Sequence, residues 1–221
     1  MPVLMFINLK GGVAKTTNAV AVSEFLAEAG HRVLLIDADH QCAASELLLG
    51  ESCLERCDFT RSTLHDLFNE MLKYEFEGDT FASFVRPAKS FKTETVTGKL
   101  SCLPSSLRID EFHNIYNAAR QNFRTNDEFH SVLVRRLRGF KKWLRSNFDY
   151  TIIDCPPSLP MQVQLLVKTA DAYVVPCIPD KLSVRGSFYL VDRFRRKNFK
   201  LPGVGTIWTL YRDQNSVHRD M

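Results

Sequence analysis

Lysines, glycines and threonines near the start of the chain form a pattern suited to binding phosphate. They belong to the run Lys10-Gly11-Gly12-Val13-Ala14-Lys15-Thr16-Thr17. An apolar segment at 3–7 precedes this run, and a helical pattern at 18–29 follows it. Glycines let backbone N–H groups approach phosphate oxygens, and the helix adds the positive end of its dipole. Because the Lys15 ammonium can reach terminal phosphates and the Thr16 hydroxyl can ligate Mg²⁺, the spacing predicts a nucleoside triphosphate site.

Three acidic residues follow apolar segments that have the composition of buried strands. Asp37 and Asp39 come after residues 33–36, and Asp154 comes directly after residues 151–153. Ligands of parallel α/β sheets bind at the carboxyl ends of the strands, where these acids and the glycine run are all expected. Alone, Asp154 would be interpreted as a turn or helix-capping residue. Beside a phosphate loop, an acid at the end of an apolar strand is typical of a site that orders Mg²⁺ and its waters.

The elements needed to hold these residues alternate between strands and helices. Strands are predicted at 3–9, 33–36, 100–103, 150–154, 172–176 and 204–210. Helices are predicted at 16–29, 45–49, 62–74, 79–85, 107–119, 127–146 and 182–197, with a loop at 50–60 and a loop or hairpin at 88–99. This alternation predicts an α/β fold with a mostly parallel, twisted sheet and helices on both faces. We expect residues 1–221 to form a single domain.

Composition narrows the class of protein further. The chain has 221 residues, 45% of them hydrophobic and 24% charged, as is typical of globular proteins. Apolar runs are too short to cross a bilayer, and Lys10 and the glycines interrupt the layout of a signal peptide, so we expect a cytoplasmic protein. The six cysteines form no Cys-x-x-Cys pair, which favours free thiols over a zinc or iron–sulfur site.

Positive charge is concentrated in two stretches, although the net charge is only +4. Residues 135–145 contain six basic residues and no acidic one, and residues 185–200 contain six basic residues and one acid, Asp192. Local positive charge is expected of a surface that binds a polyanion. The alternative is a solvated helix face, and this alternative is the stronger one for residues 135–145.

Three motifs together resemble those of the ParA/MinD family of deviant Walker A ATPases. KGGVAKTT at 10–17, with a lysine before the glycines, resembles the Walker A motif of that family. LLIDADHQC at 34–42 resembles its second motif, and TIIDCPPSL at 151–159 resembles its Walker B and switch region. Weaker matches are TLHDLF at 63–68, LPSSLRI at 103–109, ADAYVVP at 170–176, and Ser183 with Gly186. The likeness covers nearly the whole chain and is closest to ParA/Soj-type partitioning ATPases.

The resemblance implies a P-loop NTPase fold, binding of ATP and Mg²⁺, and a role for each matching residue. Lys15 is expected to bind the β- and γ-phosphates, and Lys10 to reach the ATP of a partner subunit in an ATP-dependent homodimer. Thr16 would ligate Mg²⁺, and Asp154 would hold it through the water shell. Asp39 would position or activate the attacking water. Asp37 would support these groups, and the remaining residues from Gly11 to Thr17 would surround the phosphates.

The sequence departs from the family pattern in three places. Ala14 replaces a glycine, and its Cβ would be tolerated only at a negative φ, so slower hydrolysis or altered affinity is expected. His40 replaces a proline, which predicts a less rigid loop. The family normally continues past the position of Met221 with a strand and helices that complete the adenine pocket. The base-binding edge is therefore expected to be unusual, or the chain truncated.

The function implied is a slow Mg-dependent ATPase that binds DNA non-specifically when ATP-bound and partitions a plasmid or chromosome. A ParB-like activator would stimulate hydrolysis, and the protein would associate with the nucleoid. The DNA contacts are expected from Arg193, Arg195, Arg196 and Lys197. One alternative is a MinD-like or cargo-positioning ATPase. MinD-like members bind membrane through a C-terminal amphipathic helix, and this sequence shows no such helix, so we expect no membrane partner. Another is a metallocluster-carrying reductase or assembly ATPase, which the cysteine spacing disfavours.

Overall fold

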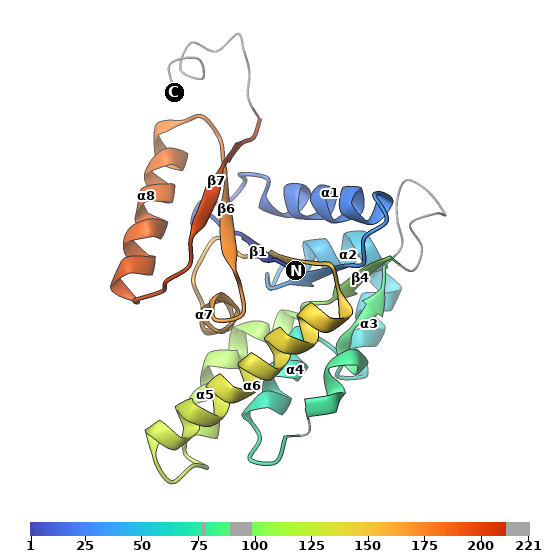
Figure 1. Ribbon diagram of the computed structural model, residues 1–221, viewed down its shortest axis with the longest axis vertical. Coiled ribbons are helices and arrows are strands. Elements are labelled where there is room, and N and C mark those ends of the chain that lie inside the picture. Colours follow the sequence, from blue (N-terminus) through green and yellow to red (C-terminus); the bar gives the residue numbers. More distant parts are fainter. Residues whose placement is uncertain (77, 89–98, 211–221) are drawn as a thin grey trace.

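A central sheet organises the protein in the computed structural model, which describes residues 1–76, 78–88 and 99–210 (Figure 1). Within those residues the sheet has seven strands in the order β3-β4-β2-β5-β1-β6-β7. The strands are β1 (Val3–Phe6), β2 (Val33–Asp37), β3 (Arg86–Pro87), β4 (Leu100–Leu103), β5 (Tyr150–Asp154), β6 (Ala172–Cys177) and β7 (Gly203–Trp208). All neighbouring strands run parallel except β3 and β4. The predicted α/β class with a mostly parallel sheet is confirmed.

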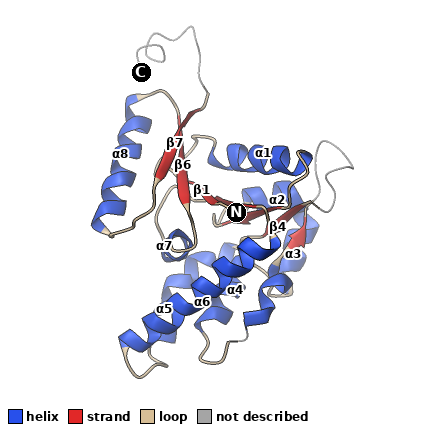
Figure 2. Cartoon of the chain, in the orientation of Figure 1, coloured by secondary structure: helices blue, strands red, loops and turns tan. Residues whose placement is uncertain are grey.

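Helices cover both faces of the sheet, as the continuous apolar strands require (Figure 2). The α-helices are α1 (Lys15–Glu28), α2 (Ala43–Leu49), α3 (Glu51–Phe59), α4 (Leu64–Leu72), α5 (Phe112–Arg120), α6 (Asn126–Asn147), α7 (Met161–Val167) and α8 (Lys181–Arg196). Short 3₁₀ helices occur at η1 (Gly78–Phe84) and η3 (Leu107–Glu111). Helices α1 and α2 pack on one face, and α4 to α8 pack on the other.

Strand β2 shows how the sheet separates two apolar cores. All five of its residues are buried. Leu34 and Ile36 join the larger core, which lies beneath α4 to α8. Val33 and Leu35 point the other way, into the smaller core beneath α1 and α2. The alternation follows from the two-residue period of a strand, and it fixes which polar side chains at the strand end face the site.

Helix α6 lies on the larger core through the apolar stripe that its sequence predicts. Leu133, Leu137, Phe140 and Leu144 are all buried. The helix begins where the Thr125 hydroxyl accepts a hydrogen bond from the Glu128 backbone N–H at 3.1 Å, which satisfies one free donor of the first turn.

Three predicted elements differ from the structure, and two were missed. The predicted loop at 50–60 is helix α3, whose only buried residue is Cys57, so its sequence carries no apolar period. The helices predicted at 79–85 and 107–119 are the 3₁₀ helix η1 and the succession of η3 and α5. Helix α7 and the short edge strand β3 were not predicted. Of the loop predicted at 88–99, residues 89–98 lie outside the described residues. Among the helices that the structure describes, none combines the length and apolarity needed to cross a membrane.

Candidate nucleotide-binding site

The glycine run forms the loop between β1 and α1, at the carboxyl edge of the sheet. Gly12 has a φ of 70°, which its missing Cβ permits. Ala14 does not take the negative φ that a Cβ favours: its φ is 58° and its ψ is 35°, in the left-handed region. Such a conformation costs an alanine about 1–2 kcal/mol. The loop is therefore held in a glycine-like shape at the position where the family has glycine.

Lys15 lies within this loop and is almost fully buried. Its Nζ donates a hydrogen bond to the Lys10 carbonyl oxygen at 2.9 Å. Burial lowers the pKa of the Lys15 ammonium, whereas the nearby carboxylates of Asp154 and Asp39 raise it. The ammonium thus lies on the inner side of the loop, with two acidic side chains near enough to favour its charged form.

Asp154 ends β5 beside the phosphate loop and is 1% exposed. Within the described part of the chain, no hydrogen bond of standard geometry reaches either of its carboxylate oxygens. Burial, and after it the charge of the neighbouring Asp37, raise the pKa of Asp154 to about 8, although the Thr16 hydroxyl and the Lys15 ammonium oppose the rise. A buried carboxylate with two free oxygens near a hydroxyl is suited to a hard cation such as Mg²⁺.

The side chains at this edge of the sheet decide how many protein ligands a magnesium ion could have. Among the described residues, no three His, Cys, Asp or Glu side chains form a cluster that could hold a metal ion. Mg²⁺ in phosphoryl-transfer sites keeps several waters and takes one or two protein oxygens together with phosphate oxygens. Thr16 and Asp154 therefore fit this ion in the presence of a nucleotide.

Asp37 is fully buried opposite Asp154, since the two residues are paired across β2 and β5. Its Oδ2 accepts hydrogen bonds from the backbone N–H and hydroxyl of Ser45 at 2.9 and 2.7 Å, and its Oδ1 accepts one from the Asp39 N–H at 3.0 Å. Burial raises the pKa of Asp37 to about 6. Asp37 therefore anchors α2 and the backbone of Asp39, with Ser45 as a partner that the motifs did not reveal.

The loop after β2 carries Asp39 at the edge of the site. Its Oδ1 accepts a hydrogen bond from the Gln41 N–H at 3.0 Å. The imidazole of His40 lies 3.3 Å from the same oxygen through Nδ1, and 3.8 Å from Asp110. The histidine that replaces the family's proline thus contacts the carboxylate expected to act on water.

Lys10 forms a contact within its own chain that the motifs did not predict. Its Nζ lies 2.8 Å from Asp180 Oδ2, and both side chains are about one-third exposed. Asp180 also caps α8, because its Oδ1 accepts hydrogen bonds from the N–H groups of Leu182 and Ser183, both at 2.9 Å. An aspartate directly before a helical pattern is a capping signal that could have been recognised at this position.

Two further polar residues hold the phosphate loop against β6, β7 and α8. Asn8 Oδ1 accepts the Lys10 N–H at 3.0 Å, and its Nδ2 donates to the Pro176 carbonyl at 2.8 Å. The Thr209 hydroxyl donates to the Val13 carbonyl at 3.1 Å. A Cβ at Gly186 would lie 3.2 Å from Asn8 Oδ1, so glycine permits α8 to approach the loop closely.

The basic residues expected to bind DNA lie far from this edge. Arg193, Arg195, Arg196 and Lys197 are exposed at the C-terminal end of α8, about 24 Å along the helix from Asp180. Arg196 pairs with Asp192 at 2.8 Å, and Lys197 donates to Gln164 at 3.1 Å. Arg193 and Arg195 make no ion pair with any described residue.

The other basic stretch is partly engaged inside the fold. Arg136 donates to the carbonyl oxygens of Met71 and Tyr74 at 2.7 and 2.8 Å, which closes the C-terminal end of α4. Lys141 and Arg145 both pair with Asp171 at 2.7 Å. These contacts favour the structural interpretation of residues 135–145.

The parallel sheet, the glycine loop and the acids at the strand ends define a P-loop NTPase. A family profile described as an AAA domain matches residues 1–200. The chromosome partitioning protein ParA of Caulobacter vibrioides is 30% identical over 222 residues, which cover 97% of this chain and 72% of that protein. The chain belongs to the ParA/MinD family of ATPases.

Solved structures agree with the fold. A plasmid partition protein from Borrelia burgdorferi matches with a TM-score of 0.68 at 20% identity, over 99% of this chain and 82% of that one. A cobyrinic acid a,c-diamide synthase from Mycobacterium smegmatis with bound ADP and magnesium matches with a TM-score of 0.69 at 26% identity, over 100% of this chain and 79% of that one. The chain is similar to both proteins in fold, and it is similar to the second protein in sequence as well.

Proposed function

We propose that this ParA-like ATPase hydrolyses ATP with Mg²⁺, dimerises when ATP-bound, and binds DNA non-specifically to partition a plasmid or chromosome. The observation that supports this best is the convergence of the loop residues Lys10, Lys15 and Thr16 with Asp39 and Asp154 at one edge of the sheet. Thr16 and Asp154 would hold Mg²⁺, whose positive charge would offset the negative charge that develops in phosphoryl transfer.

The residues of the chain have distinct roles in this proposal. Lys15 would exchange its hydrogen bond to the Lys10 carbonyl for one to a phosphate oxygen. Thr16 and Asp154 would hold the cation. Asp39, fixed through Asp37 and the Gln41 N–H, would orient the attacking water. Because positioning and charge provide the catalysis, hydrolysis would be slow until a partner improves the geometry.

Dimerisation would depend on Lys10. In a dimer its ammonium would leave Asp180 and reach the ATP of the partner subunit, so that each site holds two lysines. ATP would then act as a switch between monomer and dimer. A ParB-like activator would end the dimeric state by stimulating hydrolysis.

DNA binding would use the exposed end of α8, where Arg193 and Arg195 are free of ion pairs with described residues. Such phosphate contacts are sequence-tolerant and depend on salt. On this proposal, the ATP-bound dimer associates with the nucleoid. The competing proposal is a cargo-positioning ATPase for which DNA is irrelevant.

Lys10→Ala tests the proposal. We expect the variant to bind a fluorescent ATP analogue within about threefold of the wild type, and to lose ATP-dependent dimerisation and hydrolysis. Sedimentation with ATP, ADP or no nucleotide, each with and without DNA, measures dimerisation and DNA binding together. Wild-type turnover in Lys10→Ala would contradict action across the dimer. Dimerisation with ATP but without DNA binding at low salt would favour the cargo-positioning alternative.

A further inference from the structure

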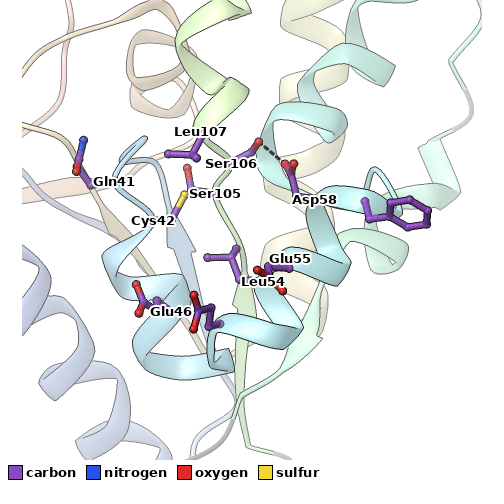
Figure 3. A pocket seen from close by; sticks show the side chains of 11 residues that line it. Gln41, Cys42, Glu46, Leu54, Glu55, Asp58, Ser105, Ser106 and Leu107 are labelled. Carbon is purple, nitrogen blue, oxygen red and sulfur yellow. Dashed lines mark hydrogen bonds between the residues drawn. The ribbon is translucent and has the colours of Figure 1, made fainter.

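A groove lies beside the loop that carries Asp39, outside the phosphate-binding loop. It runs between α2, α3 and the segment 105–107 and encloses about 500 Å³ (Figure 3). Gln41 and Cys42 form its edge nearest the nucleotide site. None of the proposed roles in ATP binding uses the α3 side of this groove.

Most of the carboxylates that line the groove have no basic partner among the described residues. Glu46, Glu51 and Glu55 line it, and none of them forms an ion pair with a described residue. Asp58 also lines it, but that carboxylate is neutralised by Arg108 at 2.9 Å. Among the described residues that line it, none is a lysine or an arginine. The resulting negative potential favours a cationic occupant and disfavours a nucleotide or nucleic acid.

Apolar side chains lie between these acids. Leu54 is half-buried on α3, while Leu107 is 76% exposed and Phe59 is 87% exposed. Exposed leucine and phenylalanine beside unpaired carboxylates match a segment with both basic and apolar side chains. A simple cation would leave the apolar surface uncovered.

A buried hydroxyl supplies an independent sign of a missing partner. Ser105 is 0% exposed, and its Oγ forms no hydrogen bond of standard geometry with a described residue, although it lies close enough to the Cys42 thiol to lower that thiol's pKa. Figure 3 shows Ser105 beside Cys42 on the inner wall of the groove, below Leu107 and between Gln41 and Ser106. A buried polar group without a partner costs about 1–3 kcal/mol, and an occupant that reached this hydroxyl would recover part of that cost.

The geometry points to a docking site for a basic, amphipathic segment of a partner protein. The inference deepens the proposed function, because it assigns a site to the partner that stimulates hydrolysis. An occupant contacting Gln41 contacts a residue whose N–H is bonded to Asp39 Oδ1, and the Cys42 N–H donates to the Asp39 carbonyl at 3.0 Å. Binding in the groove therefore acts on the loop that orients the catalytic carboxylate.

Fluorescence anisotropy without nucleotide tests binding. The probe is a short fluorescein-labelled amphipathic peptide of leucine and arginine, and its counterpart carries glutamate in place of arginine. We expect Glu51→Gln with Glu55→Gln to weaken binding of the basic probe about tenfold, because each lost charge pair contributes up to about 1 kcal/mol. The matched control is Glu28→Gln with Asp127→Asn, which removes the same charge from exposed sites on α1 and α6 and should change affinity less than about twofold.

A second pair of variants tests the apolar contact without disturbing the core. Leu107→Ser should weaken the probe about fivefold, whereas Leu47→Ser, on α2 outside the groove, should leave it unchanged. Equal losses in the groove and control variants, or equal binding of the acidic peptide, would overturn the docking site. A change in self-association of the Glu51/Glu55 variant in sedimentation would assign the groove to a second copy of the chain instead.

The ATPase measurement separates this inference from the proposed function. We expect the basic probe to accelerate hydrolysis by the wild type and the control variant, and not by the groove variant. If the chain hydrolyses no ATP, the proposed function fails while the binding result still stands. If the probe binds in the groove and leaves an active ATPase unchanged, the coupling to Asp39 is overturned.

Discussion

Asp154 is the site residue whose charge is least compatible with its surroundings. It is buried, its oxygens form no hydrogen bond of standard geometry with any residue that the structure describes, and burial together with the charge of Asp37 raises its pKa to about 8. In the unfolded chain the pKa of an aspartate is near 4. The folded state therefore holds a proton that the unfolded state releases between these values. Stability from this group is complete below about pH 4 and is lost as the pH rises through about 8.

Asp154→Asn should remove this loss in the nucleotide-free protein. We expect the variant to be more stable than the wild type by on the order of 5 kcal/mol near pH 9, and by much less near pH 5, in urea unfolding. It should also lose the stabilisation that Mg²⁺ with ATP gives the wild type. Asp127→Asn, on the exposed first turn of α6, is the control. Parallel pH profiles for wild type and Asp154→Asn would contradict the buried, protonated carboxylate.

Ala14 offers a second residue-scale prediction, because its φ of 58° is unfavourable for any residue with a Cβ. Ala14→Gly should raise the free energy of unfolding by about 0.5–1 kcal/mol, the relief of strain being partly offset by the more flexible unfolded chain. Ala21→Gly, at an exposed position within α1, should lower it by about 1 kcal/mol. Thermal unfolding of both variants compares them directly. Destabilisation by both glycines would show that Ala14 is not strained.

Local chemistry explains which site residues the sequence could predict. Lys15, Thr16 and the strand-end acids follow from motifs whose members are close in the sequence. Asp180 and Thr209 reach the same loop from about 170 and 200 residues away, through contacts that only the folded sheet creates. Their types, a helix-capping aspartate and a threonine after an apolar strand, are too common to predict those partners.

At the scale of elements, the start of α8 holds Lys10 in an ion pair within its own chain. Asp180 both caps the helix and pairs with the Lys10 ammonium. Asp180→Asn should keep the cap, since asparagine is an equally good N-cap residue, and lose the ion pair. A partly exposed pair contributes up to about 1 kcal/mol, so ATP-dependent dimerisation should become up to about fivefold tighter. Sedimentation at a range of protein concentrations measures this.

Asp180→Ala is the matched control for that prediction. It loses the ion pair and the cap together, and should lower the free energy of unfolding by about 1 kcal/mol. Weaker dimerisation in Asp180→Asn, with stability unchanged, would mean that Asp180 assists Lys10 across the dimer rather than retaining it.

The sequence predicted central elements better than peripheral ones. The strands that hold the site are continuous apolar runs because both faces are covered, and each was predicted close to its observed bounds. Helix α3 lies outside the main cores and buries only Cys57, so a polar sequence forms a helix without apolar periodicity. The groove next to α3 was therefore invisible in the sequence, although its three glutamates are local in the chain.

At the scale of the whole molecule, α8 connects two regions of opposite character. Its first residues contact the phosphate loop through Asp180, and its last turn carries exposed arginines about 24 Å away. A rigid helix that contacts both regions could transmit the position of Lys10 to the basic end. On α6, Lys141 and Arg145 form ion pairs with Asp171, so their charges are partly neutralised and contribute less to binding a polyanion.

This arrangement predicts which basic surface binds DNA. Replacing Arg193 and Arg195 together by glutamate should abolish ATP-dependent binding to non-specific duplex DNA, whereas replacing Arg135 and Arg138, equally exposed on α6, should reduce it only slightly. Milder substitution of the α8 pair by glutamine should lower the slope of log affinity against log salt by about two, one for each lost phosphate contact. Anisotropy with labelled DNA and ATP across a salt series measures both the affinity and its salt dependence.

Because all variants keep Lys10 and the phosphate loop, ATP-dependent dimerisation should persist, and its loss would show that the substitutions act on folding rather than on DNA contact. Equal effects of the α8 and α6 variants would indicate general electrostatic attraction without a defined DNA surface.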